Sequence, residues 1–145
     1  GTKDCLVIAG SVQEPFFKNE RIFYVGATTI PQLISLYKRS KYFIHLAWLD
    51  HCPNVVVDAK ASGCQIICSS TGGTKEVAGA DAIVLEEDLW DLTPVELYNP
   101  PKVDFSKKRL KNEPPAEYNI DMHEVAKKYL NFIEGGNKLE DITRL

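Results

Sequence analysis

Short runs of apolar residues recur along the chain, and segments with helical spacing lie between them. Five of these runs are rich in Val, Ile, Leu and Phe without polar alternation, which is typical of strands buried on both faces of a sheet. They cover residues 5–9, 22–25, 42–47, 65–68 and 82–85. Strands that alternate with helices predict an α/β fold, namely a doubly wound, mostly parallel sheet with helices on both faces.

The segments between the runs predict two main helices. Residues 30–39 carry apolar side chains at helical spacing. Residues 53–62 begin at Pro53, whose fixed φ suits the first helical position, with Cys52 as the expected cap. Gly63 is expected to end this helix, because glycine readily adopts the left-handed conformation that often follows a helix. A short third helix is expected after Gly73.

The last third of the chain has a different pattern. Five prolines interrupt residues 92–115, so turns and an extended connection are expected there. The basic cluster at residues 107–111 is expected to be a solvated loop face. We predict one domain over residues 1–118, in which 92–118 form an irregular connection. A helix capped by Asp121 within residues 119–136 is expected to pack on this domain, and residues 137–145 are expected to form a tail.

The composition narrows the function classes. Apolar residues make up 44% and charged residues 26% of the 145 residues, which is typical of a single soluble domain. The net charge of −3 and the lack of a basic stripe argue against a nucleic acid partner. No apolar run is long enough for a transmembrane segment, and the first residues do not resemble a signal peptide, so a cytoplasmic location is expected.

The four cysteines have neither metal-binding nor redox spacing. Cys5 and Cys68 lie in apolar runs and are expected in the core as reduced thiols. A zinc site is the alternative, built from His45, Asp50, His51 and Cys52. Because two of these residues are adjacent and one lies within a predicted strand, we expect no metal.

Two carboxylates flank the start of the predicted helix at residues 53–62. Asp50 lies in the loop ahead of it, and Asp58 shares one helix face with Asn54. The first turn of a helix offers free backbone N–H groups and the positive end of the helix dipole. This combination suits a ligand that carries phosphates next to hydroxyl groups, as a nucleotide sugar does.

These residues resemble a motif of retaining glycosyltransferases with the GT-B fold, particularly the large family four. That motif is acid-x7-acid, followed by a strand and a Gly-Gly-x-x-Glu segment. Here Asp50 and Asp58 match the acids, residues 65–68 the strand, and residues 72–76 the glycine segment. The resemblance covers roughly residues 3 to 88. It implies a Rossmann-like domain that is the C-terminal, nucleotide-sugar-binding half of a GT-B enzyme.

The resemblance also implies roles for individual residues. Asp50 is the catalytic candidate, since it would lie by the donor sugar and balance positive charge at the anomeric carbon. Asp58 would accept hydrogen bonds from the two ribose hydroxyls. The candidates for donor sugar and phosphate binding are Gly10, His51, Cys52, Pro53, Asn54, Val55, Gly72 and Gly73. The candidates for base binding are Tyr24, Val25 and Gly26.

The implied reaction transfers a hexose-type sugar from a nucleoside-diphosphate sugar to an acceptor hydroxyl with retention. It needs no cofactor, and its partners are the nucleotide-sugar donor and an acceptor of unknown identity. Family members also have an N-terminal acceptor domain, and a further strand and a cationic loop ahead of the strand that residues 5–9 match. None of these is encoded here, so we expect that the chain alone does not transfer sugar.

Two departures from the family keep other classes open. Both motif acids are Asp where the family usually has Glu, and His51 and Cys52 replace small residues. The alternatives are a nucleotide-sugar epimerase or phosphorylase of the same fold, and a non-catalytic nucleotide-sugar-binding or interaction module. A dinucleotide-dependent dehydrogenase is not favoured, because residues 10–15 lack the Gly-x-Gly-x-x-Gly pattern.

Overall fold

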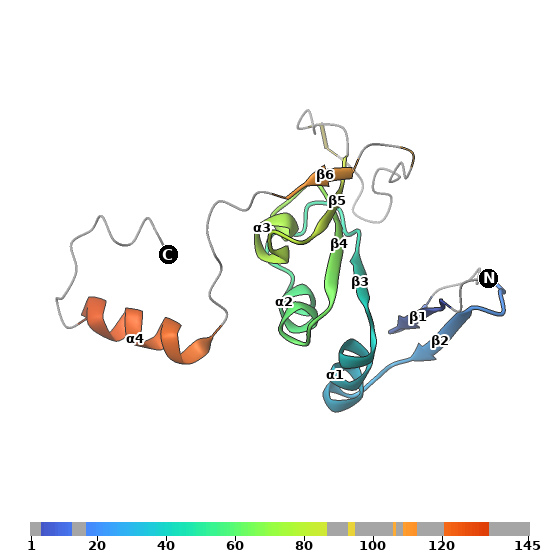
Figure 1. Ribbon diagram of the computed structural model, residues 1–145, viewed down its shortest axis with the longest axis horizontal. Coiled ribbons are helices and arrows are strands. Elements are labelled where there is room, and N and C mark those ends of the chain that lie inside the picture. The colour runs from blue at the N-terminus through green and yellow to red at the C-terminus, as the bar shows by residue number, and fades with distance from the viewer. Residues whose placement is uncertain are drawn as a thin grey trace.

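The computed structural model describes residues 4–12, 17–86, 93–94, 106, 109–112 and 121–133. Within these ranges the chain folds into strands and helices that form two separate sheets (Figure 1). The elements are β1 (Leu6–Ala9), β2 (Ile22–Gly26), α1 (Ile30–Arg39), β3 (Tyr42–His45), α2 (Asn54–Ala61), β4 (Gln65–Ser69), α3 (Thr74–Ala78), β5 (Ile83–Leu85), β6 (Arg109–Lys111) and α4 (Met122–Ile133).

The larger sheet has the strand order β3-β4-β5-β6. Its first three strands are parallel, and they are in register with Ile44 opposite Ile67 and Cys68 opposite Val84. Helices α2 and α3 connect these strands in turn, so this part of the chain confirms the predicted α/β architecture with parallel strands. Because parallel strands place their carboxyl ends at one edge, the loops after β3 and β4 lie together.

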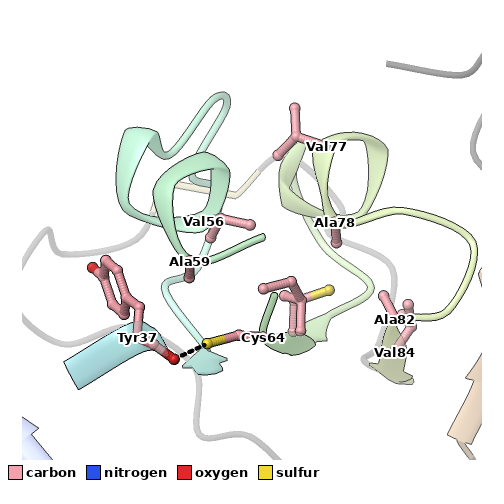
Figure 2. Close-up of a cluster of buried hydrophobic side chains, with 10 residues drawn as sticks. Tyr37, Val56, Ala59, Cys64, Val77, Ala78, Ala82 and Val84 are labelled. Atoms are coloured by element: carbon pink, nitrogen blue, oxygen red, sulfur yellow. Dashed lines mark hydrogen bonds between the residues drawn. The ribbon is translucent and has the colours of Figure 1, made fainter. Parts of the chain in front are cut away.

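The hydrophobic core lies between this sheet and helices α2 and α3, as Figure 2 shows. Ile66 and Cys68 of β4 are fully buried beneath Val56 and Ala59 of α2 and Val77 of α3. Gln65 and Ile67, which alternate with these residues along β4, are only half-buried. The predicted core position of Cys68 is therefore confirmed.

Among the described residues, the smaller sheet consists of β1 and β2, paired in parallel with Leu6 opposite Ile22. Figure 1 shows this pair to one side of the larger sheet, joined to it through α1. Leu6, Phe23 and Val25 are exposed, although their apolar runs predict burial. Cys5 is also exposed, so its predicted core position is wrong; in the described part of the chain nothing covers the end of β1 where it lies.

The helix ends follow from local chemistry. Helix α1 has the predicted bounds, and Gln32 Oε1 accepts a hydrogen bond from the Thr29 N–H at its start at 2.9 Å. Helix α2 begins one residue later than predicted, because Pro53 has an extended ψ of 110° and serves as the N-cap. Cys52 therefore lies outside the helix and is not its cap. Gly63 has the expected positive φ, 94°.

The basic segment predicted as a loop contains a short strand. Strand β6 pairs antiparallel with β5 at the edge of the larger sheet. Leu110 packs against the core while Arg109 and Lys111 are exposed, a pattern that edge strands tolerate because charged side chains there discourage further pairing. Asn112 then anchors the segment by donating to the carbonyl oxygens of Lys75 and Gly79 at 2.7 Å each.

Helix α4 is capped as predicted, since Asp121 accepts a hydrogen bond from the His123 N–H at 2.8 Å. None of its residues is buried, so its packing on the domain stays a prediction. The predicted tail and most of the predicted proline-rich connection lie outside the described residues. None of the helices that the structure describes combines the length and the apolar character needed to cross a membrane.

Candidate functional site

Two loops meet at the carboxyl edge of the larger sheet. The Gly73 N–H donates to the Asp50 carbonyl oxygen at 2.9 Å, which joins the loop after β4 to the loop after β3. A Cβ atom on Gly72 would lie 2.8 Å from that same oxygen, and one on Gly73 would overlap the His51 carbonyl oxygen. Glycine at both positions is therefore required for the close approach of the two backbones.

The Asp50 side chain is held from the end of β3. His45 Nε2 lies 3.0 Å from Asp50 Oδ2, and the two side chains are 15% and 33% exposed. An ionised carboxylate only accepts hydrogen bonds, so Nε2 is the donor. Leu49, just before Asp50, has a φ of 53°, a left-handed conformation that is rare for residues other than glycine. This turn directs Asp50 back toward His45.

The start of α2 opens beside these loops. Asn54 and Val55 are its first two residues, and both are exposed. The first N–H groups of a helix have no carbonyl partner within the helix, so they are available to a ligand. The structure therefore brings together the predicted candidates at residues 50–55 with Gly72 and Gly73.

Asp58 has a different environment from Asp50. It is exposed on the second turn of α2, and its charge interacts with Tyr37 of α1. Burial raises the pKa of Tyr37, and the charges of Asp58 and Cys64 raise it further. The two motif acids thus lie on one loop-helix segment but have separate neighbours, His45 for Asp50 and Tyr37 for Asp58.

The candidates in the smaller sheet lie away from this site. The Gly10 N–H donates to the Gly26 carbonyl oxygen at 2.8 Å, so the ends of β1 and β2 meet each other. No ladder in the described residues joins either strand to β3, and the structure therefore does not bring Tyr24, Val25 and Gly26 next to Asp58. A hollow of about 560 Å³ lies beside β2, and its lining includes Lys18, Glu20 and Tyr24.

The thiols divide into two buried and two exposed groups. Burial raises the pKa of Cys68 to about 11 and also raises that of Cys64, so both stay protonated at neutral pH. Cys52 is exposed at the mouth of α2. No group of three or more potential metal-binding side chains occurs among the residues described.

His45 is the site residue that the sequence analysis did not select. His45 lies within the apolar run at residues 42–47, and the sequence suggests a role for it only in the zinc alternative. The available signal was the spacing of five residues between His45 and Asp50. A tight loop after a strand can bring a loop residue back beside the last residue of that strand. The left-handed turn at Leu49 had no signal, since leucine rarely adopts it.

The comparisons with known proteins give one match. A family model described as glycosyl transferases group 1 matches residues 6–91, which is more than half of the chain. Neither the curated proteins nor the solved structures gave a match. The matched range includes both loops of the site and the whole of α2. The chain therefore belongs to the group 1 glycosyltransferases, enzymes that transfer a sugar from a nucleotide-sugar donor to an acceptor.

Proposed function

We propose that the start of α2 and the two joined loops bind the diphosphate and hexose of a nucleoside-diphosphate sugar. The observation that carries this proposal is the hydrogen bond between Gly73 and Asp50, which fixes two loops beside the opening of a helix. A helix opening attracts anions through its free N–H groups and its dipole. The neighbouring carboxylate can then accept hydrogen bonds from the sugar hydroxyls.

The ribose is assigned to Asp58. This carboxylate is exposed on α2, one turn beyond the helix opening, and it matches the second acid of the acid-x7-acid motif. A carboxylate accepts from two vicinal hydroxyls at once, which favours a ribose over an isolated hydroxyl group.

The transfer reaction is proposed to retain the anomeric configuration and to move a hexose to an acceptor hydroxyl. Retention follows from the resemblance of Asp50 and Asp58 to the acid-x7-acid motif of retaining enzymes. Catalysis would depend on positioning the donor and on stabilising the leaving diphosphate at the helix opening. We further propose that these 145 residues on their own bind a nucleotide without transferring sugar.

A calorimetric and thermal-shift screen tests this proposal. The probes are uridine, guanosine and adenosine diphosphates and their hexose conjugates, and one nucleoside is expected to give saturable stabilisation. Asp58→Ala should weaken binding of both the diphosphate and its conjugate by about tenfold, because a charged acceptor for two hydroxyls is lost. Asp50→Ala should weaken only the conjugate. Asp4→Ala, at another exposed acid, is the matched control and should change neither.

A second candidate function is a non-catalytic nucleotide-sugar-binding module. It is favoured by the engagement of Asp50 with His45 and by the shorter reach of Asp compared with Glu. Assays with nucleotide-sugar donors and acceptor alcohols distinguish the classes by product. A glycoside supports the transferase, a sugar phosphate or a free isomer supports a phosphorylase or epimerase, and binding without turnover supports the module. If both Asp50→Ala and Asp58→Ala bind the probes as the wild type does, the proposed site itself is ruled out.

A further inference from the structure

Three independent constraints converge on Asp50. Its backbone carbonyl accepts the Gly73 N–H, its side chain is bound by His45, and the preceding residue, Leu49, has a left-handed conformation. A left-handed leucine persists only where the surrounding structure holds it in place. Such over-determined conformations are concentrated at binding and catalytic sites. The carboxylate is therefore oriented before any ligand arrives.

His45 is itself rigidly mounted. It is the last residue of β3, opposite Cys68 of β4, and its side chain is 15% exposed. Its ring stacks with the ring of Phe43 at a centroid distance of 6.3 Å and an interplanar angle of 19°. Phe43 in turn meets the Tyr37 ring edge-on, with centroids 5.2 Å apart. Packing from the core thus fixes the position of the His45 donor.

We propose that His45 is a positioning residue that fixes the Asp50 carboxylate for the donor sugar, an inference that rests on the proposed function. The Nε2–H group holds Oδ2, and this leaves Oδ1 to accept a hydrogen bond from a sugar hydroxyl. The one-third exposure of the Asp50 side chain provides access for that contact. His45 does not touch the substrate in this arrangement.

This arrangement also accounts for aspartate at a position where the resembling family usually has glutamate. Aspartate has one side-chain torsion fewer, so less conformational entropy is lost when it is fixed. Its shorter reach allows less adjustment to the ligand, which makes its orientation before binding more important. A histidine donor from the adjacent strand end supplies that orientation.

The first experiment measures the orientation of Asp50 without a ligand. Side-chain J couplings from NMR should show one χ1 rotamer for Asp50 in the wild type and in His45→Gln, whose amide nitrogen lies close to the position of Nε2. They should show rotamer averaging in His45→Leu and in His45→Asn, whose amide cannot reach that position. His123→Leu, at an exposed histidine in α4, is the matched control and should leave Asp50 fixed. A single rotamer in His45→Leu or His45→Asn would overturn the proposal.

The second experiment measures binding of the diphosphate and the hexose conjugate found in the screen. His45→Leu should lose about tenfold in affinity for the conjugate and nothing for the diphosphate, and His45→Gln should restore the affinity. Combined with Asp50→Ala, His45→Leu should have no further effect. An equal loss for both ligands, or an additive double variant, would overturn positioning through Asp50. If no probe binds, the proposed function fails, while the J couplings still decide whether His45 orients Asp50.

Discussion

Strands β1 and β4 are similar in sequence and have opposite environments. Both are short, apolar and paired in parallel, and the hydrophobic pattern predicts burial for both. Strand β4 has a neighbour on each side and two helices above it, so Ile66 is fully buried. In the part of the chain that the structure describes, β1 pairs with β2 on one side only, and Leu6 is 42% exposed. An apolar run therefore indicates that burial of the strand would be favourable. The neighbouring strands and helices determine whether the strand is in fact buried.

The two regions also differ in their polar chemistry. The larger sheet is joined to its loops and helices by hydrogen bonds that are buried, as from Asn112 to Gly79, or partly buried, as from Asn112 to Lys75 and from Gly73 to Asp50. In the smaller sheet, side-chain hydrogen bonds such as that of Asn19 are exposed. We therefore expect substitutions to have much larger effects in the larger sheet, and the following variants compare one position from each region.

The largest difference is expected between Ile66→Ala and Leu6→Ala. Ile66 fills the core under α2, so its truncation should lower the free energy of unfolding by about 2 to 5 kcal/mol through lost burial and a cavity. Leu6→Ala removes a side chain that is already 42% exposed and should cost about 1 kcal/mol or less. Urea unfolding followed by circular dichroism measures both values. Equal losses would mean that Leu6 is covered in solution and would break the comparison.

The next difference is expected between Asn112→Ala and Asn19→Ala. Asn112 is 6% exposed and satisfies two carbonyl oxygens near α3, so its loss should cost about 2 kcal/mol. Asn19 Oδ1 accepts one exposed hydrogen bond from the Arg21 N–H, and its truncation should cost about 0.5 kcal/mol or less. The same urea series measures both. A cost for Asn112 no larger than that for Asn19 would show that β6 is not anchored through this side chain.

Asparagine in place of glycine separates crowding from backbone conformation. Gly73→Asn places a Cβ atom against the His51 carbonyl and should cost about 1 to 2 kcal/mol, with amide shift changes at residues 49–52. Gly26→Asn introduces the residue type that best tolerates a positive φ into open space, so it should cost less than about 0.5 kcal/mol. Urea unfolding and amide spectra report both effects. Unchanged amide shifts at residues 49–52 in Gly73→Asn would contradict the junction of the two loops.

The smallest effect is expected from alkaline pH. Burial raises the pKa of Cys68 from 9.0 to about 11, so above pH 9 the unfolded chain releases this proton while the folded chain retains it. The folded state then loses stability as pH rises, by about 1 kcal/mol at pH 10 for this thiol. The free energy of unfolding of Cys68→Ala should decline less steeply between pH 8 and about pH 10 than that of the wild type. Cys5→Ala, at an exposed thiol in the smaller sheet, should keep the wild-type slope.

The sequence predicted the elements of the matched region well because their signals are local. The apolar stripe of α1 lies within that helix, and the proline and glycine that bound α2 are adjacent to it. The aspartate cap of α4, outside the matched region, is equally local. Strand β6 was missed because only Leu110 faces the core. A three-residue edge strand with charged ends has the same composition as a solvated loop.

The candidate site was predicted in part. Residues that follow parallel strands share an edge of the sheet, and the candidates Asp50 and Gly73 accordingly meet. The candidates Gly10 and Gly26 would lie at that edge only if β1 stood in the same sheet as β3. Strand order depends on pairings between distant segments, and no local pattern specifies them. The hydrogen bond from His45 to Asp50 likewise depends on a left-handed leucine that propensity does not predict.

The hydrogen bond between Gly73 and Asp50 couples the motions of two loops that belong to different crossovers. When one loop opens, the bond breaks and the other loses its restraint, so the Gly73 amide should exchange with solvent at a rate that reports both loops together. A ligand bound to either loop would slow that exchange, so the exchange rate of this single amide would report how much of the protein has ligand bound.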